Sequence, residues 1–170
     1  PAALLFRVPI RAFVRAIKEP AMIAFSTTSS EAALPKAMEA MEALGAPRSI
    51  VAFVMPLGYS FNLDGSSLYL SLASVFVAQA AGIPLTFGQQ LLMVFTLMIT
   101  SKGVAGVPRA SLVILAGTLA SFHLPPEGVA VLLAIDGLMD MARSAVNVIG
   151  NGLAAAIMAR WEGQFRAPPA

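Results

Sequence analysis

The last long apolar segment of the chain, residues 129–158, carries its polar side chains on a single face. Each residue of an α-helix advances by about 100°, so the six polar positions of this segment fall within an arc of roughly 100°. Ionisable groups are costly in apolar surroundings and seldom occur there unless they face a protein interior or a water-filled cavity. The pattern therefore predicts a helix with a binding site along one face. The polar positions are Asp136, Asp140, Arg143, Ser144, Asn147 and Asn151.

Two earlier segments have apolar runs that are too short for an ordinary membrane span. These are residues 20–33 and residues 86–100, and each leads into a cluster of Ser and Thr. A membrane-spanning helix needs about 20 apolar residues, so both segments are predicted to be half-helices that enter a bilayer, turn and return on the same side. Similar patterns from Ser or Thr to Pro at the two turns indicate a weak inverted repeat. The predicted hairpins cover residues 20–46, with a tip near 29–35, and residues 85–122, with a tip near 101–108.

Residues 48–82 form a long apolar segment that polar residues and glycines interrupt near its middle, at positions 58–67. Irregular backbone is tolerated at membrane depth where it lines a site, and freed carbonyl oxygens together with the Asp64 carboxylate can coordinate a small cation. A kink packed against Ser or Thr of a neighbouring helix is the alternative, but a kink needs no Asp. The sequence predicts a broken transmembrane helix with a cation site at the break.

Composition indicates a membrane protein. Hydrophobic residues make up 58% of the chain and charged residues 12%, and the mean hydropathy is +0.79, whereas an average soluble domain is about 25% charged. The net charge of +2 is too small to indicate nucleic-acid binding, and the absence of Cys excludes a disulfide framework and a thiolate metal site. We therefore expect an all-α polytopic membrane protein with two re-entrant helical hairpins and two long transmembrane helices, the first of them broken.

Basic residues are concentrated in the first fifty residues and at the C-terminal end. By the positive-inside rule, both chain ends and the connection near residues 36–48 are expected to be cytoplasmic. Because the sequence starts with Pro1, we expect a fragment. Its Arg-rich lead-in is typical of a chain that continues from an upstream membrane segment, so the fragment is expected to insert poorly when expressed alone. The expected divisions are a cytoplasmic lead-in (1–19), the first hairpin (20–46), the broken helix (48–82), the second hairpin (85–122), a substrate-binding transmembrane helix (127–161) and a cytoplasmic tail (162–170).

Four motifs follow one another along nearly the whole chain. They are TTSSEAALP at 27–35, GYSFNLDGS at 58–66, TSKGVAGVP at 100–108 and DMARSAVNVIGN at 140–151. With these motifs the chain resembles the C-terminal half of the dicarboxylate/amino acid:cation symporters, the glutamate transporter family, and within it the bacterial proton-glutamate symporters. The resemblance implies symport of glutamate or aspartate without an organic cofactor. It also implies a bacterial inner-membrane homotrimer whose scaffold helices precede this region.

The resemblance further implies roles for single residues. Arg143 is expected to pair with the side-chain carboxylate of the substrate, and Asp140 with its α-ammonium, because a planar guanidinium binds a carboxylate in bidentate fashion. Alternatively, Asp140 and Arg143, spaced i,i+3, neutralise each other in a buried core. The other expected substrate-binding residues are Ser29, Ser30, Ser66, Val107, Ser144 and Asn147. The second tip is the expected extracellular gate, with Ser101, Lys102, Gly103, Gly106 and Pro108.

Departures from the sodium-driven relatives bear on the coupling ion. Asn151 occupies the position of an Asp that ligates sodium in those relatives, and Lys102 adds a cation to a tip whose carbonyls bind sodium there. Both changes favour a proton as the coupling ion, with sodium-coupled amino acid symport and proton-coupled C4-dicarboxylate symport as alternatives. A non-functional fragment of such a transporter is a more distant alternative. Leu70 occupies the position of the proton-carrying Glu of animal relatives, so Glu31, Asp64 or Asp136 is expected to carry the proton. All coupling-ion candidates are Glu31, Gly58, Asn62, Asp64, Asp136 and Asn151.

Two other function classes fit the sequence less well. An intramembrane hydrolase needs a nucleophile and a base, but the only His, His123, is expected in a loop, and no Ser-Lys or paired-Asp arrangement is placed at matching depth. A passive channel needs polar residues along a whole pore, whereas here they concentrate near mid-membrane. Saturable, concentrative uptake would exclude both classes.

Overall fold

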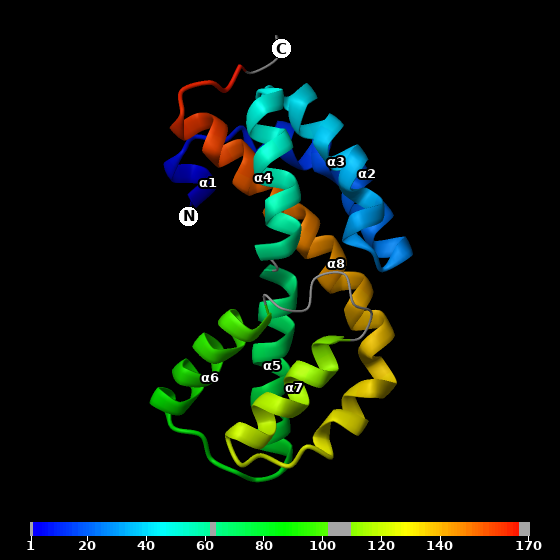
Figure 1. Ribbon diagram of the computed structural model, residues 1–170, viewed down its shortest axis with the longest axis vertical. Helices are drawn as coiled ribbons and strands as arrows, with labels where there is room; N and C mark the ends of the chain where they lie inside the picture. The colour runs from blue at the N-terminus through cyan, green and yellow to red at the C-terminus, as the bar shows by residue number, and fades with distance from the viewer. Residues whose placement is uncertain (1, 62–63, 102–109, 167–170) are drawn as a thin grey trace.

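The computed structural model describes residues 2–61, 64–101 and 110–166, and within these ranges all regular structure is helical. The molecule is elongated, and its longest helix connects its two ends (Figure 1). The expected all-α fold class is confirmed. The helices are α1 (Ala2–Leu5), α2 (Ile10–Thr27), α3 (Ser30–Leu44), α4 (Arg48–Phe61), α5 (Asp64–Ala80), α6 (Phe87–Thr100), α7 (Ala110–Ser121) and α8 (Gly128–Trp161).

Helix α8 joins two hydrophobic cores. Its C-terminal half packs with α1, α2, α3 and α4 at one end of the molecule, and its N-terminal half packs with α5 and α7 at the other end, where α6 packs on α5 and α7 (Figure 1). The polar stripe of α8 therefore lies where the two cores meet. Fully or nearly fully buried members of the first core are Phe13, Met41, Met55, Val148 and Ala155, and those of the second are Leu70, Met93, Leu97, Leu115 and Leu132.

Helices α2 and α3 form an antiparallel pair with a short turn. Thr28 ends α2 with φ of 54°, and the Ser29 hydroxyl accepts a hydrogen bond of 3.2 Å from the Ala32 amide. Because this cap satisfies an amide of the first turn, α3 starts directly after Ser29. The turn is therefore shorter than the expected tip at residues 29–35, and Pro35 lies inside α3.

Helix α2 is longer than the apolar run alone predicts. It begins at Ile10 and passes through position 20, where the sequence pattern places the start of the hairpin. Phe13, Ile17 and Ala24 follow helical spacing and are buried. Charged residues between them face outwards, so the helix is amphipathic over a stretch that contains few consecutive apolar residues.

The break between α4 and α5 is narrower than expected. α4 is helical to Phe61 and α5 from Asp64, so Gly58 lies inside the first helix and Ser66 inside the second. Most of the interruption at positions 58–67 is therefore helical. Residues 62–63, which include the candidate Asn62, lie outside the described residues.

The second helix pair consists of α6 and α7. A capping box starts α6, because the Gln89 amide donates to the Thr86 hydroxyl at 3.3 Å and the Thr86 amide donates to the Gln89 side chain at 2.9 Å. The expected tip at residues 102–108 lies outside the described residues, apart from Ser101 just before it.

In the described part of the chain, we find no helix that is both long enough and apolar enough to cross a membrane. α4 and α5 have 14 and 17 residues, and α8 has 34 residues but includes Asp136, Asp140 and Arg143. The long transmembrane helices and the re-entrant course of the two helix pairs therefore stay predictions.

Candidate functional site

Neighbouring helices bury most of the polar stripe of α8. Asn151 is fully buried, and Asp136, Arg143, Ser144 and Asn147 are all less than 9% exposed. The Asp140 side chain keeps 24% of its surface exposed. Five of the six positions that share a face in the sequence pattern are thus buried, and the described parts of α3, α4 and α5 supply their contacts.

Arg143 and Asp140 form an ion pair at the centre of this stripe. The Nε and Nη2 atoms of Arg143 donate to Oδ1 of Asp140 at 3.1 and 2.5 Å. The third guanidinium nitrogen, Nη1, is buried and has no hydrogen-bond partner among the described residues. A buried donor without a partner costs about 1–3 kcal/mol. The two residues therefore neutralise each other, as the alternative expectation holds, while one donor group of Arg143 stays available to another acceptor.

Tyr69 of α5 supports Arg143 from a second side and was not anticipated from the sequence. The Arg143 guanidinium carbon lies 5.0 Å from the centre of the Tyr69 ring, within cation–π distance. The Tyr69 hydroxyl donates to Oδ1 of Asp136 at 3.2 Å. Tyr69 therefore connects the buried Asp136 to Arg143. The one sequence feature that could have identified Tyr69 as a site residue is its spacing, because it lies at i+3 from Ser66 and so on the same face of α5.

Asn147 joins α8 to the start of α5. Its side-chain oxygen accepts hydrogen bonds from the amides of Gly65 and Ser66 at 2.8 and 3.3 Å, and its nitrogen donates to the Ser66 hydroxyl at 3.3 Å. The first amides of a helix have no partner within the helix. The Asn147 side chain satisfies two of them, which explains why α5 begins so soon after α4 ends.

The first helix pair reaches the same region of α8. The Ser30 hydroxyl donates to the Ser144 carbonyl oxygen at 3.3 Å. Ser30 is half-buried, and Ser29 before it acts as the cap of α3. The structure thus brings Ser30 and Ser66, from two other segments of the chain, into contact with Ser144 and Asn147 on the stretch of α8 that also carries Arg143.

Three coupling-ion candidates lie close together about one helical turn beyond Asn147 on α8. The side chain of Asn151 lies against Gly58 so closely that a Cβ atom at position 58 would overlap it. The carboxylate of Asp64 lies against Gly150 in the same way. Gly58 of α4 and Asp64 of α5 therefore pack against one short stretch of α8, at Asn151 and Gly150. The absence of a side chain at Gly58 and at Gly150 allows this close approach.

The other two described candidates lie apart from this cluster. Asp136 is buried two turns from Arg143 along α8 and binds Tyr69. Glu31 is exposed in the first turn of α3. Within the described residues, no group of three or more His, Cys, Asp or Glu side chains could hold a metal ion.

One expected gate residue contacts the site region. Ser101 is fully buried at the end of α6, and its hydroxyl lies 3.4 Å from that of Ser67 on α5. The other expected tip residues, Lys102, Gly103, Gly106, Val107 and Pro108, lie outside the described residues.

Gly65 allows α5 to approach α8 closely at this site. A Cβ atom at position 65 would overlap the backbone carbonyl of Arg143. Overpacking against a rigid backbone typically costs about 1–3 kcal/mol, so Gly65→Ala is expected to lower the melting temperature of the full-length protein by several degrees.

Gly88→Ala is the matched control for this prediction. Gly88 also lies in a helix, but a Cβ atom there would meet nothing within 4 Å. Since Ala favours helices over Gly by about 1 kcal/mol, this variant is expected to melt at or above the parent temperature. Equal melting temperatures for Gly65→Ala and Gly88→Ala would contradict the close packing of α5 on α8.

Comparison with known proteins identifies the family. Residues 1–161 match the family model of the sodium:dicarboxylate symporters. A proton/sodium-glutamate symport protein of Geobacillus stearothermophilus is 52% identical over 163 residues, which are 96% of this chain and 39% of that protein. A proton/glutamate-aspartate symporter of Escherichia coli (strain K12) is 53% identical over 152 residues, which are 89% of this chain and 35% of that protein.

A relative that is named for a different substrate is also similar. A C4-dicarboxylate transport protein of Bacillus subtilis (strain 168) is 47% identical over 154 residues, or 90% of this chain and 37% of that protein. The chain thus spans between 35% and 39% of the length of these three relatives. The match over residues 1–161 covers all four sequence motifs, and the chain belongs to the sodium:dicarboxylate symporter family.

Proposed function

We propose that this chain forms the substrate-binding core of a membrane symporter that carries glutamate or aspartate together with a proton. The observation that carries the proposal is the buried Arg143 guanidinium, with two nitrogens bound to Asp140 and Nη1 without a partner among the described residues. A buried cation with a spare donor is suited to bind a carboxylate of a small substrate.

The two charges of the ion pair fit the two charged ends of an acidic amino acid. The side-chain carboxylate of the substrate would accept from Arg143, and the partly exposed Asp140 would accept from the substrate ammonium. Tyr69 holds Arg143 in place by its ring, so the guanidinium is positioned before a substrate arrives. This preorganisation reduces the entropic cost of binding.

Polar groups around the pair would bind the α-carboxylate. The hydroxyls of Ser66 and Ser144, the amide of Asn147 and the tip residues Ser29 and Ser30 are the proposed contacts, together with Val107 of the second tip. Asn147 already binds the start of α5 and the Ser66 hydroxyl, so besides its own proposed contact it holds the Ser66 hydroxyl beside the substrate. The second tip, from Ser101 to Pro108, is the proposed gate.

A proton is the proposed coupling ion. Asn151 places a neutral amide against Gly58, where an anionic oxygen would favour a dehydrated cation. Asp64, Asp136 and Glu31 are the proposed proton carriers. Relatives are named both proton/sodium-glutamate and proton/glutamate-aspartate symporters, so sodium is the alternative ion.

We further propose that the protein works in a bacterial cytoplasmic membrane as a homotrimer. The matched regions make up only 39% and 35% of these two relatives. In this proposal, helices that precede the region in the family build the trimer scaffold, and the two helix pairs α2–α3 and α6–α7 are the re-entrant hairpins.

Symport of C4-dicarboxylates is a second candidate function. One similar relative is named a C4-dicarboxylate transport protein, and the ion pair supports the idea, because Asp140 is already bonded to Arg143 and a substrate without an ammonium leaves that bond intact.

Uptake by the full-length protein in proteoliposomes tests the proposed function. With an inward proton gradient in sodium-free buffer, glutamate is expected to accumulate above its external concentration and to saturate, with strong inhibition by aspartate and weak inhibition by succinate. Stronger inhibition by succinate than by aspartate would favour the C4-dicarboxylate function. Absence of any concentrative uptake, with either a proton or a sodium gradient, would exclude symport.

A further inference from the structure

Three cations of α2 form a stripe on the side of the helix that faces away from the protein core. Arg11, Arg15 and Lys18 fall within an arc of about 60° on the helix, and all three side chains are exposed. The buried residues Phe13 and Ile17 lie on the opposite side. We call Arg11, Arg15 and Lys18 the basic stripe.

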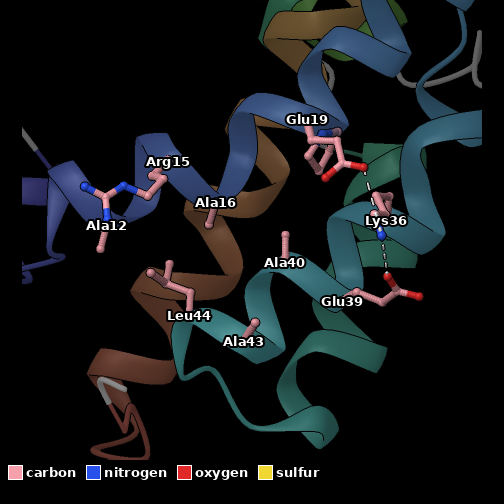
Figure 2. Close-up of a pocket in the computed structure, with 10 residues that line it drawn as sticks. Ala12, Arg15, Ala16, Glu19, Lys36, Glu39, Ala40, Ala43 and Leu44 are labelled. Carbon is pink, nitrogen blue, oxygen red and sulfur yellow. Dashed lines mark hydrogen bonds and ion pairs between the residues drawn. The ribbon is translucent and has the colours of Figure 1, made fainter. Parts of the chain in front are cut away.

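The basic stripe has no acidic partner in the described part of the chain. The ion pairs within 4.0 Å there join Lys36 to Glu19, Lys36 to Glu39 and Arg143 to Asp140. Figure 2 shows Lys36 between Glu19 and Glu39, whereas the guanidinium of Arg15 lies toward the N-terminal end of α2, near Ala12, and points away from both carboxylates. The carboxylates of Glu19 and Glu39 are thus engaged by Lys36, and none of the described acidic side chains forms an ion pair with the stripe.

Apolar side chains border the stripe at the same end of the molecule. Ile10 and Val14 are exposed beside it on α2, and Leu4 and Leu5 of α1 are more than 70% exposed. Trp161, the last residue of α8, is 72% exposed, and its ring lies 6.1 Å from that of Phe6 between α1 and α2. Cations beside exposed apolar and aromatic groups are typical of a helix that lies at a membrane surface.

We propose that the basic stripe binds the phosphate groups of anionic phospholipids in the cytoplasmic leaflet. The inference rests on the membrane location given under the proposed function. Clusters of Lys and Arg next to membrane segments attract anionic lipids, and here Ile10, Val14 and Trp161 can enter the apolar edge of the headgroup layer while the three cations contact phosphates. The stripe then holds α2, the first helix of the pair α2–α3, at the membrane surface.

The test uses the delipidated full-length protein in detergent, with phosphatidylglycerol or phosphatidylcholine added in increasing amounts. Phosphatidylglycerol is expected to raise the melting temperature of the parent protein by several degrees more than phosphatidylcholine. Each cation at an anionic surface contributes about fivefold in affinity. The triple variant Arg11→Gln/Arg15→Gln/Lys18→Gln is therefore expected to bind phosphatidylglycerol about a hundredfold more weakly and to lose this preference. All three positions are exposed, so the variant is expected to fold.

Two control variants separate the stripe from charge in general. Arg11→Lys/Arg15→Lys keeps the charge and is expected to keep the lipid preference. Lys36→Gln removes one exposed cation that is already paired with Glu19 and Glu39, and it is expected to behave as the parent in its lipid preference.

Three results would overturn the proposal. They are an equal response of the parent to the two lipids, an unchanged preference in the triple variant, and an equal stabilisation by inorganic phosphate at the same phosphate concentration, which would indicate a site for a free anion. The lipid titration does not depend on transport. Absence of glutamate uptake in every lipid would therefore contradict the proposed function. The lipid titration would still decide whether the basic stripe binds anionic phospholipids.

Discussion

Replacement of Arg143 by Ala is expected to abolish measurable binding of glutamate and aspartate. Arg143 is buried, is bonded to Asp140 and has a spare donor at Nη1. Removal of one partner from a buried charge pair typically costs about 2–5 kcal/mol, or about thirtyfold to several thousandfold in affinity. The variant also leaves Asp140 without its cation, which repels an acidic substrate. Isothermal titration of the purified full-length protein with both amino acids measures the effect.

Arg160→Ala is the matched control, because Arg160 is the other Arg of α8 and packs on the Phe165 ring near the end of the helix. It is expected to bind glutamate as the parent does. Arg143→Lys keeps the charge but loses the planar, forked donor arrangement, so an intermediate affinity is expected. Near-parental affinity in Arg143→Ala would remove Arg143 from the substrate site.

Replacement of Asn151 by Asp is expected to make transport respond to sodium. Asn151 is fully buried against Gly58, and the Asp64 carboxylate lies against the neighbouring Gly150. A new buried carboxylate is costly unless it takes up a proton or binds a cation. With Asp64 close by, sodium is expected to offset this cost, so sodium should raise both the melting temperature and the rate of glutamate uptake by the variant. The parent is expected to show neither effect in the same buffers.

The sodium response is measured in proteoliposomes and by thermal unfolding, each with sodium or choline chloride. Gln79→Glu serves as the control, since it also adds one carboxylate but at an exposed position at the end of α5, and it is expected to remain insensitive to sodium. Lys102→Gln can be combined with Asn151→Asp, because a cation at the expected gate opposes sodium entry. A parent protein whose uptake already requires sodium would refute proton coupling, and the proposed role of Asn151 with it.

Long-range contacts explain why some parts of the site could be predicted from the sequence and others could not. Helical periodicity alone places the six polar residues of α8 on one face, and the structure buries five of them. The family follows from four motifs that are local in sequence, and the match over residues 1–161 confirms it. In contrast, the extent of the break between α4 and α5 depends on Asn147, which lies more than eighty residues later and binds the amides of Gly65 and Ser66.

The sequence by itself determined the helical class, the family and the polar face of α8, because side-chain periodicity and short motifs require no knowledge of distant neighbours. Tertiary structure alone decided which donors are satisfied. It joined Tyr69 to both Asp136 and Arg143, assigned the Asn147 side chain to the start of α5, and placed Gly58 and Gly150 against Asn151 and Asp64. These contacts form between helices that are far apart in the chain. Their geometry depends on how closely the helices pack, and no local pattern records that distance.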